Sequence, residues 1–185
     1  MRKNFGVKSW FYPQPVLIIA TYDENGNPDA MNAAWGGLYD GNKVELCLSA
    51  GHKTTKNIRA TGAFTVSFAD AANVVASDYV GLASANTEPK KMEKSGFHLT
   101  KSEFVNAPLI DELPVAMECK LIKINEDGNV IGEIVNVSAD VSVLGEDGNI
   151  DFSKFRPISF EPVHNGYHVL GERVGNAFQD GAALK

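Results

Sequence analysis

Three similar turns divide this chain and constrain its fold more than any other feature. Asn-Gly and Asp-Gly pairs between apolar runs are typical of tight hairpins, because both residues of the pair tolerate positive φ. The first turn predicts a hairpin of residues 16–22 with 29–35, and the second pairs 115–124 with 130–143. The third follows closely and leads into a further strand at 150–155. The turns read Asp23-Glu24-Asn25-Gly26-Asn27, Glu126-Asp127-Gly128-Asn129 and Glu146-Asp147-Gly148-Asn149.

Apolar runs at 43–48 and 63–68 predict two more strands, so antiparallel β structure is the dominant signal. Three short helices are expected between strands. The first spans 54–61 and ends at Gly62 in a left-handed cap, and the second spans 70–81 with Asp70 as its N-cap. The third spans 88–95, with Pro89 at an early position. Together these elements predict a mainly β fold, a barrel decorated by short helices.

Length and charge narrow the classes of protein. With 185 residues, the chain is expected to form one domain over 1–185, with a C-terminal arm from about residue 157. A net charge of −6 argues against binding to nucleic acid or to an anionic membrane surface. The apolar run at 16–20 is too short for a signal peptide, and no stretch approaches the ~20 apolar residues of a membrane span. Cys47 and Cys119 lie in apolar segments, which predicts two buried, reduced thiols in a cytoplasmic protein.

The segment from Gly51 to Ile58 has the chemistry of an anion site. It reads Gly-His-Lys-Thr-Thr-Lys-Asn-Ile, with a flexible glycine, a cation and two hydroxyls where a helix is expected to begin. Helix N-termini present unpaired N–H groups and a positive dipole end, so a phosphate is stabilised there. Threonine also caps ordinary helices, so these residues equally fit a plain helix start. The spacing of a P-loop is absent, and no Gly-x-Gly-x-x-Gly follows a strand.

The segment Asn32-Ala33-Ala34-Trp35-Gly36-Gly37 carries small residues that would let a flat group lie against a strand. The alternative is a strand that ends in a bulge, with Trp35 buried in the core. We expect residues 32–35, 46–49 and 53–57 to meet at one corner of the barrel. A phosphate site beside a flat surface is typical of a nucleotide-like cofactor.

Several motifs, in their order along the chain, resemble the flavin reductase-like FMN-binding family, and its flavoredoxin branch most of all. The resemblance continues through residues 78–86, 107–110, 113–119 and 132–135, so it covers nearly the whole chain. The motifs are Pro-Val-Leu-Ile-Ile-Ala-Thr, Asp-x-x-Gly-x-Pro, Asn-Ala-Ala-Trp-Gly, Leu-Cys-Leu-Ser, His-Lys-Thr-Thr-x-Asn-Ile and Thr-Gly-Ala-Phe-Thr-Val-Ser.

This resemblance implies a split β-barrel of antiparallel Greek-key type that forms a homodimer, with FMN near the subunit interface. It assigns one segment to the isoalloxazine ring, a second segment to the ring or the ribityl chain, and a third to the phosphate. A loop then completes the site. In that order, the implied FMN-binding residues are Asn32, Ala33, Ala34 and Trp35; Cys47, Leu48 and Ser49; His52, Lys53, Thr54, Thr55 and Asn57; and Ser84, Ala85, Asn86 and Lys91.

The implied activity is that of a flavoprotein oxidoreductase. NADH or NADPH would reduce FMN, which would pass electrons to free flavin, a metal ion or a redox partner protein. One alternative is an FMN electron carrier without its own NAD(P)H turnover, and another is a barrel that has lost its cofactor and binds other ligands. Because hydride arrives at the flavin directly from a nicotinamide, no catalytic side chain is predicted.

Three remaining features each allow a functional and a purely structural interpretation. His164 and His168 are four residues apart, but Asn165-Gly166 between them indicates a turn, so no metal site is predicted. The C-terminal run is expected to be a lid or a dimer arm, in which Tyr167 or Phe178 either approaches the flavin or packs on the barrel. A lysine cluster either forms a solvated face or attracts a phosphorylated nicotinamide; its members are Lys90, Lys91, Lys94 and Lys101.

Overall fold

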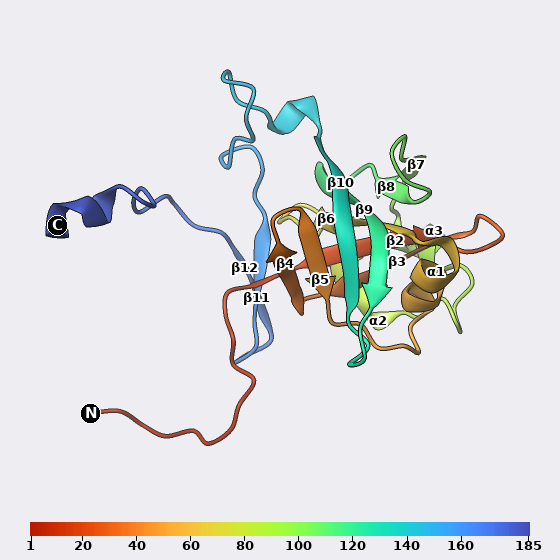
Figure 1. Ribbon diagram of the computed structural model, residues 1–185, viewed down its shortest axis with the longest axis horizontal. Coiled ribbons are helices and arrows are strands. Elements are labelled where there is room, and N and C mark those ends of the chain that lie inside the picture. Colours follow the sequence, from red (N-terminus) through yellow and green to blue (C-terminus); the bar gives the residue numbers. More distant parts are fainter.

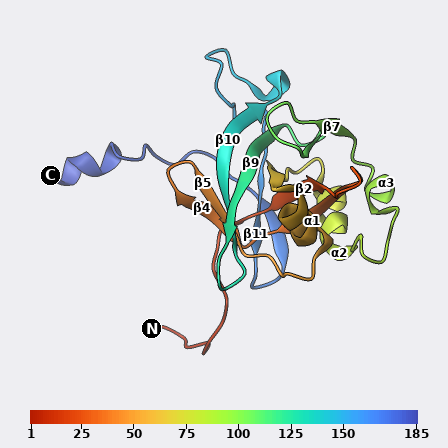
Figure 2. The ribbon, with the colours of Figure 1, turned by 45° about the vertical axis from the view of Figure 1, so that its right-hand side comes forward.

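A seven-stranded antiparallel sheet forms the body of the molecule in the computed structural model, which describes residues 1–185. The sheet curls strongly, and the helices gather at one side of it (Figures 1 and 2). In spatial order its strands are β3 (Pro28–Ala33), β2 (Leu17–Tyr22), β6 (Ala63–Phe68), β9 (Val115–Ile124), β10 (Val130–Ala139), β5 (Lys43–Leu46) and β4 (Gly36–Asp40). The predicted mainly β barrel is confirmed.

Smaller elements surround this sheet. A three-stranded sheet has the order β1 (Gln14–Pro15), β11 (Ile158–Glu161) and β12 (Gly166–Val169), and a two-stranded one pairs β7 (Leu99–Lys101) with β8 (Pro108–Ile110). The α-helices are α1 (Lys53–Thr61), α2 (Val74–Leu82) and α3 (Lys91–Ser95), and short 3-10 helices are η1 (Val141–Val143) and η2 (Asp180–Leu184). No helix has both the length and the apolar composition needed to cross a membrane.

The two edge strands of the large sheet follow one another in the chain. Only Ala34 and Trp35 separate β3 from β4, although these strands lie at opposite ends of the strand order. Gly36 makes this possible, because a Cβ there would lie 2.8 Å from Leu46 Cδ2 and 3.2 Å from Leu17 Cδ1. The edges therefore approach each other at Ala34–Gly36, and the sheet closes toward a barrel.

Two hairpin turns have the predicted form, and the third differs. Gly26 and Gly128 have φ of 81° and 89° and join β2 to β3 and β9 to β10. The expected strand 130–143 ends at Ala139, because Asp140 accepts a 2.7 Å hydrogen bond from the Ser142 amide and begins η1. The third turn closes only an isolated bridge, and residues 150–155 form turns instead of the expected strand.

The helices lie close to their expected positions. Gly62 ends α1 in the left-handed conformation, φ 70°, as predicted. Helix α2 begins at Val74 rather than at residue 70, since the Asp70 carboxylate accepts from the Asn73 amide at 2.9 Å and holds a turn ahead of the helix. Helix α3 begins only at Lys91.

Apolar side chains pack on both faces of β2. Inside the barrel, Leu17 and Ile19 pack with residues such as Phe64, whose ring lies over Gly132. On the outer face, Ile18 packs with residues that include Val80 of α2. The expected burial of Cys47 was wrong: it is exposed, because it follows the end of β5. Trp35 is 58% exposed where the chain crosses between the sheet edges, which contradicts the alternative that it is buried in the core.

Candidate functional site

A hollow of about 290 Å³ lies between β3, the start of α1, the end of α2 and the N-terminus of α3. We call it the first hollow. Seven of the expected site residues line it: Asn32, His52, Lys53, Thr54, Ser84, Ala85 and Lys91. Residues 32, 52–54, 84–85 and 91 therefore meet around one cavity, whereas residues 46–49 of the expected corner do not line it. Asp29, Met31 and residues 80–83 complete its wall.

A buried ion pair lies in the wall of the first hollow. Lys91 Nζ is 3.1 Å from Asp29 Oδ1, and both side chains are almost fully buried, at 3% and 2% exposure. Thr54 Oγ1 donates to the other carboxylate oxygen of Asp29 at 2.6 Å. This one carboxylate thus holds α1 and α3 against β3. Buried charges that are paired and hydrogen-bonded in this way fix geometry, because losing either partner is costly.

The first turn of α1 has unsatisfied donors. His52 occupies the N-cap position but makes no capping hydrogen bond, and no acidic residue lies in the first turn. The backbone amides of Lys53, Thr54 and Thr55 have no acceptor among the hydrogen bonds of the protein. Such free N–H groups, at the positive end of a helix dipole, favour an anion.

Lys53 does not stand free in the first hollow. Its Nζ lies 3.3 Å from Asp23 Oδ2, in the turn between β2 and β3. Burial acts to raise the pKa of Asp23, but hydrogen bonds from Asn27, Asn25 and Lys53 outweigh it and lower that pKa to about 2. Lys53 is still 31% exposed, so an anion at the helix start would share this ammonium with Asp23.

The loop after α2 is tied to α1. Asn86 accepts a hydrogen bond from Lys56 Nζ at 3.3 Å and donates to the Gly51 carbonyl at 3.1 Å. The expected residue Asn86 is therefore a brace between the two segments that carry Ser84 and His52, not part of the lining itself. Ser49 is also outside the lining, and its carbonyl accepts from the His52 amide at 3.1 Å.

Asn32 stands where β3 meets α2. Its side-chain amide donates to the Ser77 carbonyl at 3.0 Å, and a Cβ on Gly81 would lie 2.9 Å from Asn32 Cβ. Nearby, Tyr167 of β12 donates to Asp78 at 2.7 Å. Burial and the Asp78 carboxylate raise the pKa of Tyr167 to about 12. The C-terminal hairpin thus packs against the wall that carries Asn32.

A second hollow, also of about 290 Å³, lies just beyond the end of β3. Ala34, Trp35 and Cys47 line it, together with Phe11, Gln14 and residues of β4. Asn32 lines the first hollow and Ala34 the second, so the two hollows lie on either side of the end of β3. Gln14 is 7% exposed and its Oε1 has no hydrogen-bond partner. Burial and Glu45 raise the pKa of the Cys47 thiol.

Besides Ser49 and Asn86, four more of the expected site residues have side chains that reach neither hollow. Ala33 and Leu48 pack in the barrel interior. Asn57 donates to Thr21 Oγ1 at 3.0 Å in the core, and Thr55 is fully buried with an unpaired hydroxyl. Only their backbone groups are available to a ligand.

Sequence reasoning missed Asp29, Gly81 and Gln14. An aspartate at the start of a predicted strand was a usable signal for Asp29, because such a residue needs a partner when buried. Nothing near Gly81 or Gln14 in the sequence indicated their contacts, which come from segments far away in the chain. No group of three or more His, Cys, Asp and Glu side chains has the arrangement of a metal site.

Comparisons with known proteins agree with this fold. A family model described as the flavin reductase like domain matches residues 9–159. Flavoredoxin of Desulfovibrio vulgaris (Miyazaki F) is 36% identical, with a TM-score of 0.93 and coverage of 98% of this chain and 100% of that chain. Flavoredoxin from Methanosarcina acetivorans is 25% identical, with a TM-score of 0.89 and full coverage of both chains. An FMN-binding domain from Shewanella baltica OS155, 21% identical over 88% of this chain and 89% of its own, has the same fold with a TM-score of 0.78.

Proposed function

Because this chain belongs to the family of flavin reductase like domains, we propose that it binds FMN and acts as an oxidoreductase. In this proposal NADH or NADPH donates electrons to the bound flavin, which passes them on to an acceptor. The observation that carries it is the first hollow, where the uncapped start of α1 and two lysines converge beside β3.

The residues of the first hollow fit a phosphate. Three free backbone amides at the start of α1 are oriented donors, and the ammonium groups of Lys53 and Lys91 supply positive charge. Hydrogen bonds from charged donors are the stronger kind. Since Asp23 and Asp29 already pair with these lysines, the amides would carry much of the binding.

The residues of the second hollow fit the polar edge of a flat ring. Ala34 and Gly36 present little side-chain bulk, and Trp35 offers a partly exposed aromatic surface. The unpaired Gln14 Oε1 is a buried acceptor without a donor, which is costly unless a ligand supplies one. When bound, FMN supplies the redox chemistry of its ring, and these side chains orient it and exclude water.

Absorption spectroscopy tests the proposal directly. The purified protein, supplied with FMN and freed of excess, should keep a flavin spectrum that bleaches when NADH or NADPH is added without oxygen. Lys53→Ala should weaken FMN binding by roughly 1.5–3 kcal/mol, the scale of a charged hydrogen bond. Lys43→Ala is the matched control, since that lysine pairs with Asp40 on the β4–β5 hairpin. A wild-type protein that retains no flavin would refute the proposal.

A second candidate is an electron carrier that binds FMN but does not oxidise a nicotinamide by itself. The 36% identity to a flavoredoxin over nearly the whole chain favours it. Steady-state oxidation of NADH and NADPH separates the two candidates. Flavin that stays oxidised with both nicotinamides, yet accepts electrons from dithionite, would select the carrier.

We also propose that the protein is a homodimer. The second hollow opens beside exposed apolar side chains on β4 and the preceding segment, among them Trp35, Leu38 and Tyr39. Large exposed apolar patches mark interaction surfaces. Light scattering of the flavin-loaded protein should give twice the mass of one chain.

A further inference from the structure

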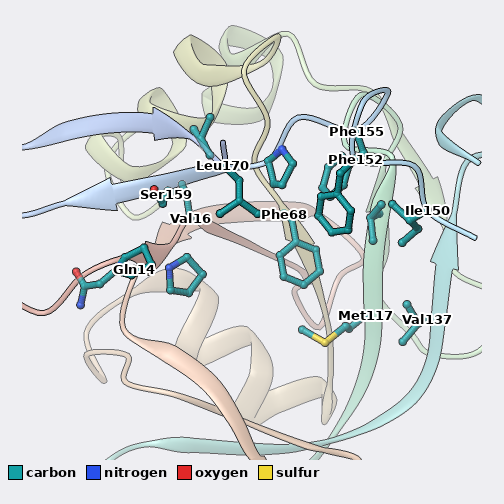
Figure 3. Close-up of a pocket in the computed structure, with 15 residues that line it drawn as sticks. Gln14, Val16, Phe68, Met117, Val137, Ile150, Phe152, Phe155, Ser159 and Leu170 are labelled. Atoms are coloured by element: carbon teal, nitrogen blue, oxygen red, sulfur yellow. The ribbon is translucent and has the colours of Figure 1, made fainter. Parts of the chain in front are cut away.

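An apolar concave surface lies beside the second hollow. It is a groove of about 550 Å³, which we call the apolar groove, and it shares Gln14 and Pro15 with the second hollow. Of its fifteen lining residues only Gln14 and Ser159 are polar. Figure 3 shows the rings of Phe68, Phe152 and Phe155 gathered with Leu170, while the Gln14 amide points away from them.

The rim of this groove is exposed in a single chain. Val137 is 56% exposed, Phe152 62% and Leu170 52%, although all three line the same groove. Neighbouring Phe155 and Ile158 are buried, so the groove has a packed floor and an open mouth. A concave surface of this size and composition is suited to apolar side chains.

The chain also carries an apolar segment with nothing to pack on. Of the arm expected from about residue 157, the first part forms β11 and β12, and only residues 171–185 leave the body after Leu170 and extend away from it (Figure 1); we call this last part the C-terminal arm from here on. Val174, Phe178 and Leu184 on this arm are fully exposed, at 96%, 106% and 94%. Large apolar side chains in such a row are costly in water.

The conformation of the arm presents these side chains outward. Phe178 has φ of 66°, a left-handed conformation that bulky residues rarely adopt. Hydrogen bonds between Asn176 and Asp180 hold the turn around it, with the Asn176 amide donating to the Asp180 carboxylate at 2.8 Å. The arm is therefore shaped locally, while its apolar contacts are missing.

We propose that the C-terminal arm of one chain inserts Val174, Phe178 and Leu184 into the apolar groove of a second copy. The arm departs from the groove wall at Leu170 and runs outward, so it would have to reverse to reach its own groove. The residues of the arm that precede η2 would span up to about 30 Å if extended, enough to reach a neighbouring copy. A two-fold axis then gives two identical exchanges, in which each copy supplies one arm and one groove.

This inference names the contact that joins the homodimer proposed above, and it does not depend on flavin chemistry. Because the groove and the second hollow share Gln14 and Pro15, a seated arm would also cover the side of the flavin site formed by β1. Arm exchange thus links assembly to the environment of the proposed ring site.

Light scattering and sedimentation test the apolar contacts. Replacing Val174, Phe178 and Leu184 together by Asp should raise the dimer dissociation constant at least about 100-fold, as expected for three large apolar side chains kept out of a buried site. The matched control replaces Ala177, Gln179 and Ala183 by Asp, which adds the same three charges to the same arm and leaves the Asn176–Asp180 hydrogen bonds in place. Since residues 171–185 are all exposed, both variants should keep the circular dichroism and thermal unfolding of the folded chain.

Cross-linking then identifies which groove receives the arm. In a Cys47→Ser background, a tagged chain with Phe178→Cys is mixed with an untagged chain with Val137→Cys and treated with a short bismaleimide. A covalent tagged–untagged pair is expected, and Asp127→Cys, in the β9–β10 turn, replaces Val137→Cys as the negative control. A dimer that forms no such pair would overturn arm exchange while leaving the homodimer intact. An intrachain link in a chain carrying both cysteines, without links between chains, would also overturn it.

Discussion

The buried pair of Lys91 and Asp29 leads to the sharpest stability prediction. The two charges lie 3.1 Å apart, at 3% and 2% exposure, and at an effective dielectric constant of about 20 their attraction is about 5 kcal/mol. Desolvation offsets much of that attraction in the intact pair, but Lys91→Met would leave the Asp29 carboxylate buried with Thr54 as its remaining donor. Breaking a buried pair in this way typically costs about 3–5 kcal/mol.

Urea unfolding of the flavin-free protein measures this cost. With a slope of about 2 kcal/mol per molar urea, a loss of 4 kcal/mol lowers the midpoint by about 2 M. The matched control is Lys90→Met, because Lys90 is 68% exposed and lies 3.7 Å from Glu93, and such surface pairs contribute about 0–1 kcal/mol. The double variant Asp29→Asn with Lys91→Met should recover most of the loss, since it removes both charges together. If Lys91→Met and Lys90→Met unfold at the same urea concentration, the pair does not hold α3 to β3 as described.

Three further predictions concern the surroundings of the two hollows. Gly81→Ala should destabilise the protein by about 1–3 kcal/mol and weaken FMN binding, because its Cβ would lie 2.9 Å from Asn32 Cβ. Gly51→Ala is the control for unfolding, since a Cβ there meets no neighbouring atom. Equal unfolding midpoints for the two variants would contradict the prediction. Because the pKa of Tyr167 is raised to about 12, its contribution to stability is complete below pH 10 and is lost as the pH rises toward 12. The melting temperature of Tyr167→Phe should therefore fall less steeply over that pH range than that of the unchanged protein. Alkylation followed by mass spectrometry should show that exposed Cys47 reacts and that FMN slows this reaction. Cys119 is buried and has a pKa of about 12, so it should react only after unfolding.

Local sequence signals predicted the elements whose cause is local. Gly26, Gly62 and Gly128 adopt the positive φ expected of them, because turn and cap geometry depends on a few adjacent residues. Strand β4 was not predicted, since its Gly-Gly start has low strand propensity and the strand forms by pairing with β5. The exposure of Cys47 also escaped prediction, because an apolar neighbourhood in sequence does not reveal where a strand ends.

The candidate site was predictable in its segments but not in its contacts. The Gly51–Ile58 pattern indicated an anion site, and α1 does begin there with unpaired amides. Asp29 and Lys91 are 62 positions apart, so only the folded chain reveals their pairing. The expectation that the ligand is a flavin rested on family resemblance, and the family itself is confirmed.

The strand order has a consequence for how the chain acquires its structure during synthesis. The β4–β5 hairpin is hydrogen-bonded to the rest of the sheet through β10, which begins at Val130. Until the ribosome has released that later hairpin, residues 36–46 have no strand to join, and the apolar side chains around them stay open to other chains. Slow translation between residues 46 and 130 would therefore prolong this exposure, and a chaperone acting over that interval would protect the chain from aggregation. A truncation before Val130 would leave the β4–β5 hairpin without its partner strand.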